Sequence, residues 1–358
     1  MSNKSLSYTW RPALDFGLDG GTRMRVSMAR YRQMQRIAAE STEMVRAGRI
    51  FVSTVCQGCQ LPFIVALTVV ARPVAAVTPV AAPPPATAAE IEATAPASAW
   101  RPVAAENLML VETAKGTLTI ELAPGFAPAH VAAIRKLVRG GAFAGGVVVR
   151  VQDNYVVQFA AKAAAATASA PGIAAAAPAL PAEYEMPLAK VPFAPLPYPD
   201  AYADTAGFSD GWPVARDAAA AWLVHCYAIV GAGRDLPPST GDGSELYAVI
   251  GHAPRHLDRN MAVVGRVIDG IAPFAALPRG TEALGFYKTD AEKLPITGAR
   301  LAADMPAATR PKFEVMRSDT ATFAALIEAR ANRREPFFLR PAGRVDVCNV
   351  RIPVRRVR

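Results

Sequence analysis

The residues that could do chemistry lie in the stretch GGVVVRVQDNYVVQF, residues 145–159, where one arginine interrupts two short apolar runs. β-Branched and aromatic residues predict strands at 147–151 and 155–159, and the polar residues between them are typical of a hairpin turn. Arg150 lies in the first strand, and Gln158 follows it by eight residues. An arginine keeps its charge, and its rigid fork of donors can address two acceptors at once. The alternative is an edge-strand arginine that points to water.

Other catalytic patterns in the sequence are incomplete. Gly231 and Gly233 could begin a phosphate-binding loop, but two prolines, Pro237 and Pro238, follow where its helix should start. The four histidines form no H-E-x-x-H zinc motif, and Ser244 is not in a G-x-S-x-G elbow. His225, in an apolar run, is better explained as a hydrogen-bonded core histidine than as a ligand. We therefore expect no metal and no cofactor.

Strand and helix signals surround the arginine hairpin. Leu118, Ile120 and Leu122 alternate with polar residues, which predicts a strand with one buried face. A helix is expected from Pro128, which suits a first helical turn, to Gly140, which suits a helix end. Further apolar runs predict strands at 222–230, 246–250, 262–267 and 296–301.

Three stretches, in this order, resemble the motifs of cyclophilin-type peptidyl-prolyl cis-trans isomerases. They are ETAKGTLTIELAPGFAPAHVAAIRKLV (112–138), the arginine hairpin, and GSELYAVIGHAPRHLDRNMAVVGRVIDG (243–270). The family's catalytic arginine and the glutamine eight positions later match Arg150 and Gln158. The resemblance implies a mostly β fold, a closed eight-stranded antiparallel cyclophilin-like barrel capped by helices, here with a C-terminal α/β extension. It also implies an isomerase that acts on X-Pro bonds, with proline-containing polypeptides as partners.

Position by position, the resemblance assigns roles to nine residues. Arg150 would be catalytic, as a donor to the twisted amide, because binding the twisted form tightly requires no acid, base or nucleophile. The substrate-binding residues would be Tyr155, Val156, Gln158, Glu245, Tyr247, His256, Leu257 and Met261. The chain departs from the family's usual residues at Gly231, Glu245, Tyr247, His256 and Met261. The apolar residues that would hold the substrate's proline ring, which form the proline pocket, are kept. The polar residues around that pocket are altered.

These departures lead us to expect a working but weakened isomerase. One alternative is an inactive cyclophilin-fold module that binds proline-containing segments. Another is a scaffold protein whose tail docks a partner. The oligomeric state cannot be predicted from the sequence.

The predicted domains are a leader at 1–76, an Ala/Pro-rich linker at 77–105, the isomerase domain at 106–303 with an insertion at 160–220, and an extension at 304–358. The linker composition cannot bury enough apolar area to offset its conformational entropy, so we expect a tether, with folded structure beginning near Leu108. In the insertion, an alanine-rich stretch replaces the family's glycines and could form a short helix. The remainder is expected to be ordered loop over the barrel.

The leader carries most of the basic charge. The formal net charge is +9, and residues 1–76 hold 10 Lys/Arg against 4 Asp/Glu, which leaves 29 against 26 elsewhere. That small remaining excess, without a basic stripe, argues against a nucleic-acid partner. The apolar run Leu61–Val70 follows two arginines, as in a secretory signal, and is too short to span a membrane. We expect export to the periplasm, translation from Met44, cleavage near Ala76 and no membrane span in the mature chain. The alternative is a buried N-terminal helix.

The tail should add a helix capped by Ser318 or Asp319 and ended by Pro336. Apolar residues at 345–348 suggest one more strand. That strand could instead close the barrel, in which case 296–301 would belong to an insertion.

The four cysteines divide between the leader and the body of the chain. Cys56 and Cys59 form a C-x-x-C with no βαβ pattern around it, which makes a redox or zinc role a poor fit. Export would remove them and leave Cys226 and Cys348. We expect those two to pair in an oxidising compartment, and the alternative is two separate buried thiols.

Overall fold

The structure is a computed structural model that describes residues 85–165 and 180–357. The leader, with its apolar run and its two cysteines, and the first part of the linker lie outside the described residues. Within the described ranges, no helix is both long and apolar enough to cross a membrane.

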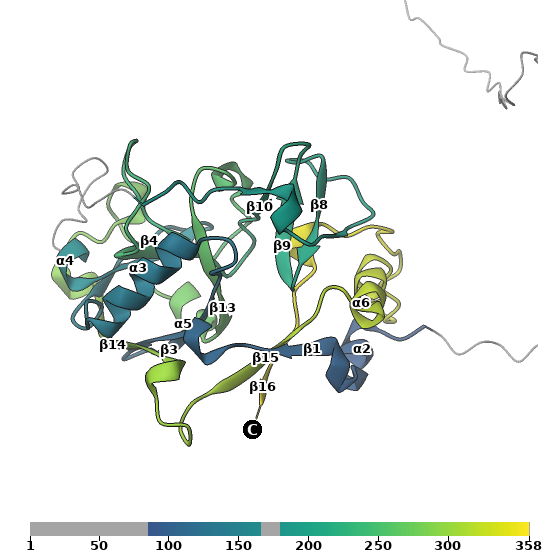
Figure 1. The fold of residues 1–358 in the computed structure, drawn as a ribbon, viewed down its shortest axis with the longest axis horizontal. Helices are drawn as coiled ribbons and strands as arrows, with labels where there is room; N and C mark the ends of the chain where they lie inside the picture. Colours follow the sequence, from purple (N-terminus) through teal and green to yellow (C-terminus); the bar gives the residue numbers. More distant parts are fainter. Residues whose placement is uncertain (1–84, 166–179, 358) are drawn as a thin grey trace, which may run out of the picture. The chain divides into compact units, whose positions relative to one another are not determined.

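Eight antiparallel strands form a closed barrel (Figure 1). They are β2 (Leu108–Thr113), β3 (Gly116–Leu122), β4 (Val147–Val151), β5 (Val156–Ala160), β11 (Ile229–Ala232), β12 (Glu245–Val249), β13 (Val263–Asp269) and β14 (Leu294–Leu301). Around the barrel the order is β11-β12-β5-β4-β14-β2-β3-β13, and β11 pairs with β13 to close it. The predicted fold class is confirmed. Because β14 pairs with both β2 and β4, the expected strand at 296–301 belongs to the barrel.

Apolar side chains that alternate along the strands fill the barrel. Leu118 and Ile120 of β3 are fully buried, together with Leu122. The helix α3 (Pro128–Arg139) packs Val131 and Ile134 into the same core; as predicted, it begins with Pro128 and is capped by Gly140. The remaining barrel helices are α4 (Lys162–Ala165), which agrees with the short helix expected in the alanine-rich stretch, and α5 (Ile271–Ala275).

The insertion forms a second antiparallel sheet, with the order β6-β10-β9-β8-β7, instead of the expected loop. Its strands are β6 (Met186–Pro187), β7 (Ala194–Pro195), β8 (Thr205–Ser209), β9 (Trp212–Arg216) and β10 (Ala220–Leu223). Asp210 and Gly211, both with positive φ, form the tight turn between β8 and β9, and Asp-Gly is a strong hairpin signal. The strand expected at 222–230 is also wrong, because the chain turns at Ala228, φ 71°, and splits it into β10 and β11.

Both ends of the described chain meet in a third sheet. Its order is β1-β15-β16, with β1 (Trp100–Pro102), β15 (Lys312–Met316) and β16 (Val354–Val357). Beside it, α2 (Ala88–Thr94) contacts α6 (Ala321–Ala331). The expectation of an unstructured tether is therefore wrong for residues 88–102. The reason is a capping box, in which the Thr87 side chain accepts from the Glu90 N–H and Glu90 accepts from Thr87, combined with burial of the helix on α6.

The cap of α6 also differs from the prediction. Thr320 is the capping residue, and its hydroxyl accepts from the Phe323 N–H. Ser318 instead accepts from the Gly211 N–H, and Asp319 forms an ion pair with Arg317.

Insertion and terminal elements share one apolar core. Phe208 of β8 and Phe323 of α6 meet edge to face, with ring centroids 5.0 Å apart.

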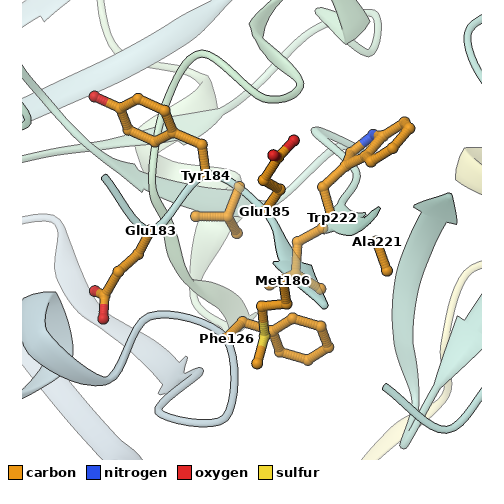
Figure 2. Close-up of a pocket in the computed structure, with 9 residues that line it drawn as sticks. Phe126, Glu183, Tyr184, Glu185, Met186, Ala221 and Trp222 are labelled. Atoms are coloured by element: carbon orange, nitrogen blue, oxygen red, sulfur yellow. The ribbon is translucent and has the colours of Figure 1, made fainter. Parts of the chain in front are cut away.

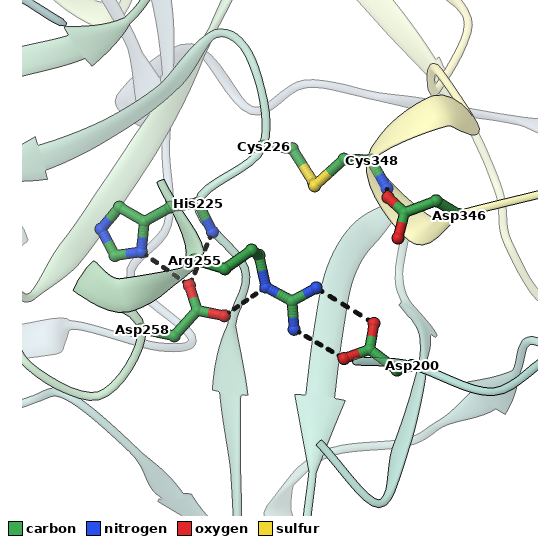
Figure 3. Close-up of a disulfide and its surroundings, with 7 residues drawn as sticks. All are labelled: Asp200, His225, Cys226, Arg255, Asp258, Asp346 and Cys348. Carbon is green, nitrogen blue, oxygen red and sulfur yellow. Dashed lines mark hydrogen bonds and ion pairs between the residues drawn. A yellow bond between two sulfur atoms is a disulfide. The ribbon is translucent and has the colours of Figure 1, made fainter. Parts of the chain in front are cut away.

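The expected disulfide between Cys226 and Cys348 is present, with Cα atoms 4.9 Å apart (Figure 3). The strand expected at 345–348 is wrong, because Asp346 caps a 3₁₀ turn there by accepting from the Cys348 N–H. The 3₁₀ turns are η1 (Ala97–Ala99), η2 (Ala105–Asn107), η3 (Leu188–Lys190), η4 (Arg255–Leu257), η5 (Ala283–Gly285), η6 (Asp290–Glu292), η7 (Ala302–Asp304) and η8 (Val347–Asn349).

Candidate active site

The hairpin of β4 and β5 places Arg150 directly opposite Gln158. The two residues are cross-strand partners, so their side chains share one face, a point that the intervening turn left open in the sequence. A register shift in β4 between Val148 and Arg150 accompanies this pairing. Asn154, with φ 50°, forms part of the turn that the sequence predicted.

Neutral acceptors hold the guanidinium of Arg150. Its Nε donates to the Leu284 carbonyl at 2.6 Å, one terminal nitrogen donates to Gln158 Oε1 at 3.3 Å, and the other donates to Gln152 Oε1. Among the described residues no carboxylate forms an ion pair with it. Burial lowers the pKa of Arg150 from its ordinary value, since the charged form loses hydration, but an arginine still remains protonated at neutral pH. The site therefore presents an uncompensated positive charge.

Glu245 continues this hydrogen-bonded row. Gln158 Nε2 donates to Glu245 Oε2 at 2.7 Å, which leaves the amide oxygen of Gln158 facing Arg150. Burial raises the pKa of Glu245, because the carboxylate is partly removed from water, and the hydrogen bond from Gln158 opposes that rise. In this site Glu245 fixes the orientation of Gln158.

An apolar cluster lies next to the arginine. Its buried members are Val156, Tyr247 and Val249, and the partly buried members are Tyr155, Leu257 and Met261. The Arg150 guanidinium carbon is 5.5 Å from the centroid of the Tyr155 ring. That ring stacks on His256, with centroids 5.9 Å apart and planes 9° apart. Contacts thus connect all nine site residues that the sequence indicated.

Tyr247 is anchored by a buried polar network that the sequence did not reveal. His225, whose side chain is fully buried, has its Nε2 2.9 Å from the Tyr247 hydroxyl and its Nδ1 2.9 Å from Asp258 Oδ1. Arg255 donates its Nε to Asp258 Oδ2 at 2.6 Å and its two terminal nitrogens to Asp200 at 3.0 Å (Figure 3). The network joins the insertion to the apolar cluster, and the interpretation of His225 as a hydrogen-bonded core residue is confirmed.

Burial, hydrogen bonds and neighbouring charges shift the pKa values of Asp258 and Tyr247 in this network. Burial alone would raise the pKa of Asp258, but the hydrogen bond and charge from His225 and the charge of Arg255 outweigh burial and hold that pKa below its ordinary value. Burial raises the pKa of Tyr247 well above its ordinary value. The His225 ring joins the two groups, because its Nδ1 faces the Asp258 carboxylate and its Nε2 faces the Tyr247 hydroxyl.

Two departures from the family's usual residues are physically linked. A Cβ at Gly231 would lie 2.2 Å from the Tyr247 hydroxyl oxygen and 2.3 Å from its ring carbon Cζ. Any side chain at position 231 would therefore displace the tyrosine. Gly231 and Tyr247 therefore form one packing unit with His225.

Replacing Tyr247 with phenylalanine should lower the free energy of unfolding by about 1 to 3 kcal/mol, because the buried Nε2 of His225 loses its hydroxyl partner. Urea denaturation measures the change. The control is Tyr227→Phe, since Tyr227 is 48% exposed and its hydroxyl forms no hydrogen bond within the described part of the chain. An equal effect of the two substitutions would show that the network does not stabilise the fold.

A small pocket lies between the barrel and the insertion, away from these residues. Figure 2 shows it beside Phe126, Met186 and Trp222. The cavity measures about 10 Å³, about the space that one water requires, so it does not fit a substrate. Nearby, Glu183 accepts from Ala129 and His130 at the start of α3, which ties the insertion to that helix.

The closed barrel, with a charged arginine beside an apolar cluster, defines a cyclophilin-like protein. The family model of cyclophilin type peptidyl-prolyl cis-trans isomerase/CLD matches residues 108–297, more than half of the 358 residues. The chain belongs to the cyclophilin-type peptidyl-prolyl cis-trans isomerase family.

Solved cyclophilin structures resemble this chain to different extents. The cyclophilin AquaCyp293 from Hirschia baltica is 26% identical, with a TM-score of 0.56, over 72% of this chain and 93% of that chain. This coverage exceeds the span 108–297, so the likeness extends beyond the family match. A cyclophilin type isomerase from Cryptosporidium parvum, crystallised in the presence of the dipeptide Ala-Pro, is 12% identical, with a TM-score of 0.35, over 54% of this chain and 98% of that chain. No curated protein matches.

Proposed function

We propose that this protein catalyses cis-trans isomerisation of X-Pro bonds in exported polypeptides. The observation that supports the proposal best is the state of Arg150: a half-buried guanidinium, held by neutral acceptors, beside a cluster of apolar side chains. A merely structural arginine at this depth would be expected to have a carboxylate partner.

The chemistry follows from the electronic structure of the peptide bond. Rotation is hindered by about 18 to 20 kcal/mol, because the nitrogen lone pair is delocalised into the carbonyl. An enzyme lowers this barrier if it binds the twisted amide more tightly than either planar form. In the proposed mechanism, the apolar cluster holds the proline ring and Arg150 donates to the twisted amide. Neither a metal nor a cofactor takes part.

One observation favours a second candidate, a weakly active or inactive module that binds proline-containing segments. Each of the three nitrogens of Arg150 already donates to a protein acceptor, and the Glu245 carboxylate lies one residue further along the row. Donors that already bind protein acceptors are less available to a substrate, and a nearby carboxylate offsets the positive charge. Both features would therefore reduce the ability of Arg150 to stabilise a twisted amide. An isomerisation assay on a short X-Pro peptide separates the two candidates, since a binding module would bind the peptide without accelerating exchange.

Export to the periplasm is part of the proposal. It is supported by the apolar run at 61–70 and by the disulfide between Cys226 and Cys348, a bond that persists in oxidising compartments. Mass spectrometry of the periplasmic fraction should find an N-terminus between about Ala76 and Pro83. A chain that stays in the cytosol and retains peptides from residues 1–43 would refute both the export and the start at Met44.

A further inference from the structure

The segment 280–287, here called the 280–287 loop, runs beside β4. It lies within the span that the family model matches but outside the three stretches that carried the resemblance in the sequence. The Gly280 N–H donates to the Val151 carbonyl at 3.0 Å, and the Tyr287 N–H donates to the Val149 carbonyl at 3.1 Å. Between them, Phe286 forms an antiparallel bridge with Arg150 itself. The loop therefore continues the pairing of β4 beyond the residues that β14 covers.

The tip of the loop turns a carbonyl toward the arginine. Leu284 and Gly285 both have positive φ, 59° and 78°, and the Gly285 N–H donates to the Glu282 carbonyl at 3.0 Å. In this turn the Leu284 carbonyl accepts the 2.6 Å bond from Arg150 Nε. The Phe286 ring centroid lies 5.5 Å from the guanidinium carbon, the same distance as that of Tyr155.

We propose that the 280–287 loop is a positioning element for Arg150, with Leu284 acting through its carbonyl and Phe286 through its ring. The inference rests on the proposed isomerase function. A guanidinium has five N–H donors, and three are engaged by Leu284, Gln158 and Gln152, which leaves two for a substrate. A main-chain acceptor at Nε fixes the plane of the fork without adding a negative charge. The arginine is thus oriented while its charge remains available to the amide.

The test displaces the carbonyl without touching the arginine. A Cβ at Gly285 would lie 2.7 Å from Gln152 Cα and 2.8 Å from the Val151 carbonyl oxygen, and φ there is positive, so Gly285→Ala must shift the tip. We expect kcat to fall about tenfold, with KM changed less than about twofold, because positioning acts on the transition state. The matched control is Gly141→Ala, because Gly141 also has a positive φ of 70°, lies at the end of α3 away from Arg150, and an added Cβ there meets nothing within 4 Å, so this variant should retain wild-type kcat.

A second readout follows the hydrogen bond itself. In the full chain, the Nε–H of Arg150 should exchange slowly with solvent, observed by NMR, in the wild type and in Gly141→Ala, and quickly in Gly285→Ala. If Gly285→Ala does not fold, Phe286→Leu replaces it, with kcat expected to fall about threefold.

Two outcomes would overturn the positioning role of the 280–287 loop, and a third would refute the isomerase function on which it rests. Unchanged kcat with a fast-exchanging Nε–H overturns the positioning role, and so does a fast-exchanging Nε–H in the wild type. An inactive wild type with a protected Nε–H refutes the proposed function but leaves the contact between the loop and Arg150 established.

Discussion

Replacing Arg150 with lysine is expected to lower kcat/KM for an X-Pro peptide by about 10² to 10³, the usual cost of removing one positioned donor from a reaction centre. Lysine carries the same charge as a single point and cannot address several acceptors in one plane, so it cannot replace the fork that contacts Leu284, Gln158 and Gln152. A protease-coupled assay measures the loss.

Stability should change little, because Arg150 has no ion pair among the described residues and is only partly buried. The melting temperature checks this point. The matched control is Arg300→Lys, because Arg300 also lies on a barrel strand but is half-exposed and pairs with Glu112. A rate for Arg150→Lys as high as that of the control would show that the reaction does not use the guanidinium.

Replacing both Cys226 and Cys348 with alanine should lower the free energy of unfolding by about 5 kcal/mol in the chain-entropy model. The two cysteines are 122 residues apart, so the bond removes much of the conformational freedom of the unfolded chain. It also ties the segment before β11 to the turn η8 in the C-terminal extension. Urea denaturation of the wild type and the double variant measures the loss.

A reductant supplies the control for this prediction. It should lower the stability of the wild type to that of the double variant and leave the double variant unchanged. A non-reducing peptide map with both cysteines as free thiols would contradict the account, and it would also weaken the proposed export to an oxidising compartment.

The barrel and its site could be predicted because their signals are local. Alternation in β3, the proline and glycine at the ends of α3, and the spacing of Arg150 and Gln158 all lie within short stretches. The resemblance to a family then supplied the long-range pairing that periodicity cannot provide. The structure added that Arg150 and Gln158 are direct cross-strand partners.

The insertion and the terminal sheet could not be predicted in the same way. β1 pairs with β15 across more than two hundred residues, and α2 is held by its contact with α6. Alanine-rich and proline-rich composition suggested a tether, but the buried partner that stabilises α2 lies at the other end of the chain. One local signal was available and unused, the Asp210-Gly211 turn between β8 and β9.

The hydrogen-bond partners that position Arg150 and Tyr247 could not be predicted from the sequence for a related reason. The Leu284 carbonyl accepts from Arg150 although the two residues are 134 positions apart in the sequence. Because every residue type has a main-chain carbonyl, the residue type at position 284 does not indicate this contact. The partner of the Tyr247 hydroxyl, His225, lies on the segment before β11, so only the fold brings them together. Tyrosine and glycine at 247 and 231 could be recognised as departures, and the structure explains why they occur together.

The central claim is that the wild-type chain accelerates X-Pro isomerisation through Arg150. The direct measurement is NMR exchange spectroscopy on a short X-Pro peptide with a catalytic amount of the full chain. Spontaneous exchange takes tens to hundreds of seconds, so cross-peaks between the cis and trans forms within a mixing time of about one second would demonstrate catalysis. We predict such cross-peaks for the wild type and their loss in Arg150→Lys. A wild-type spectrum without exchange, at peptide concentrations where binding is visible as shift changes, would contradict the account.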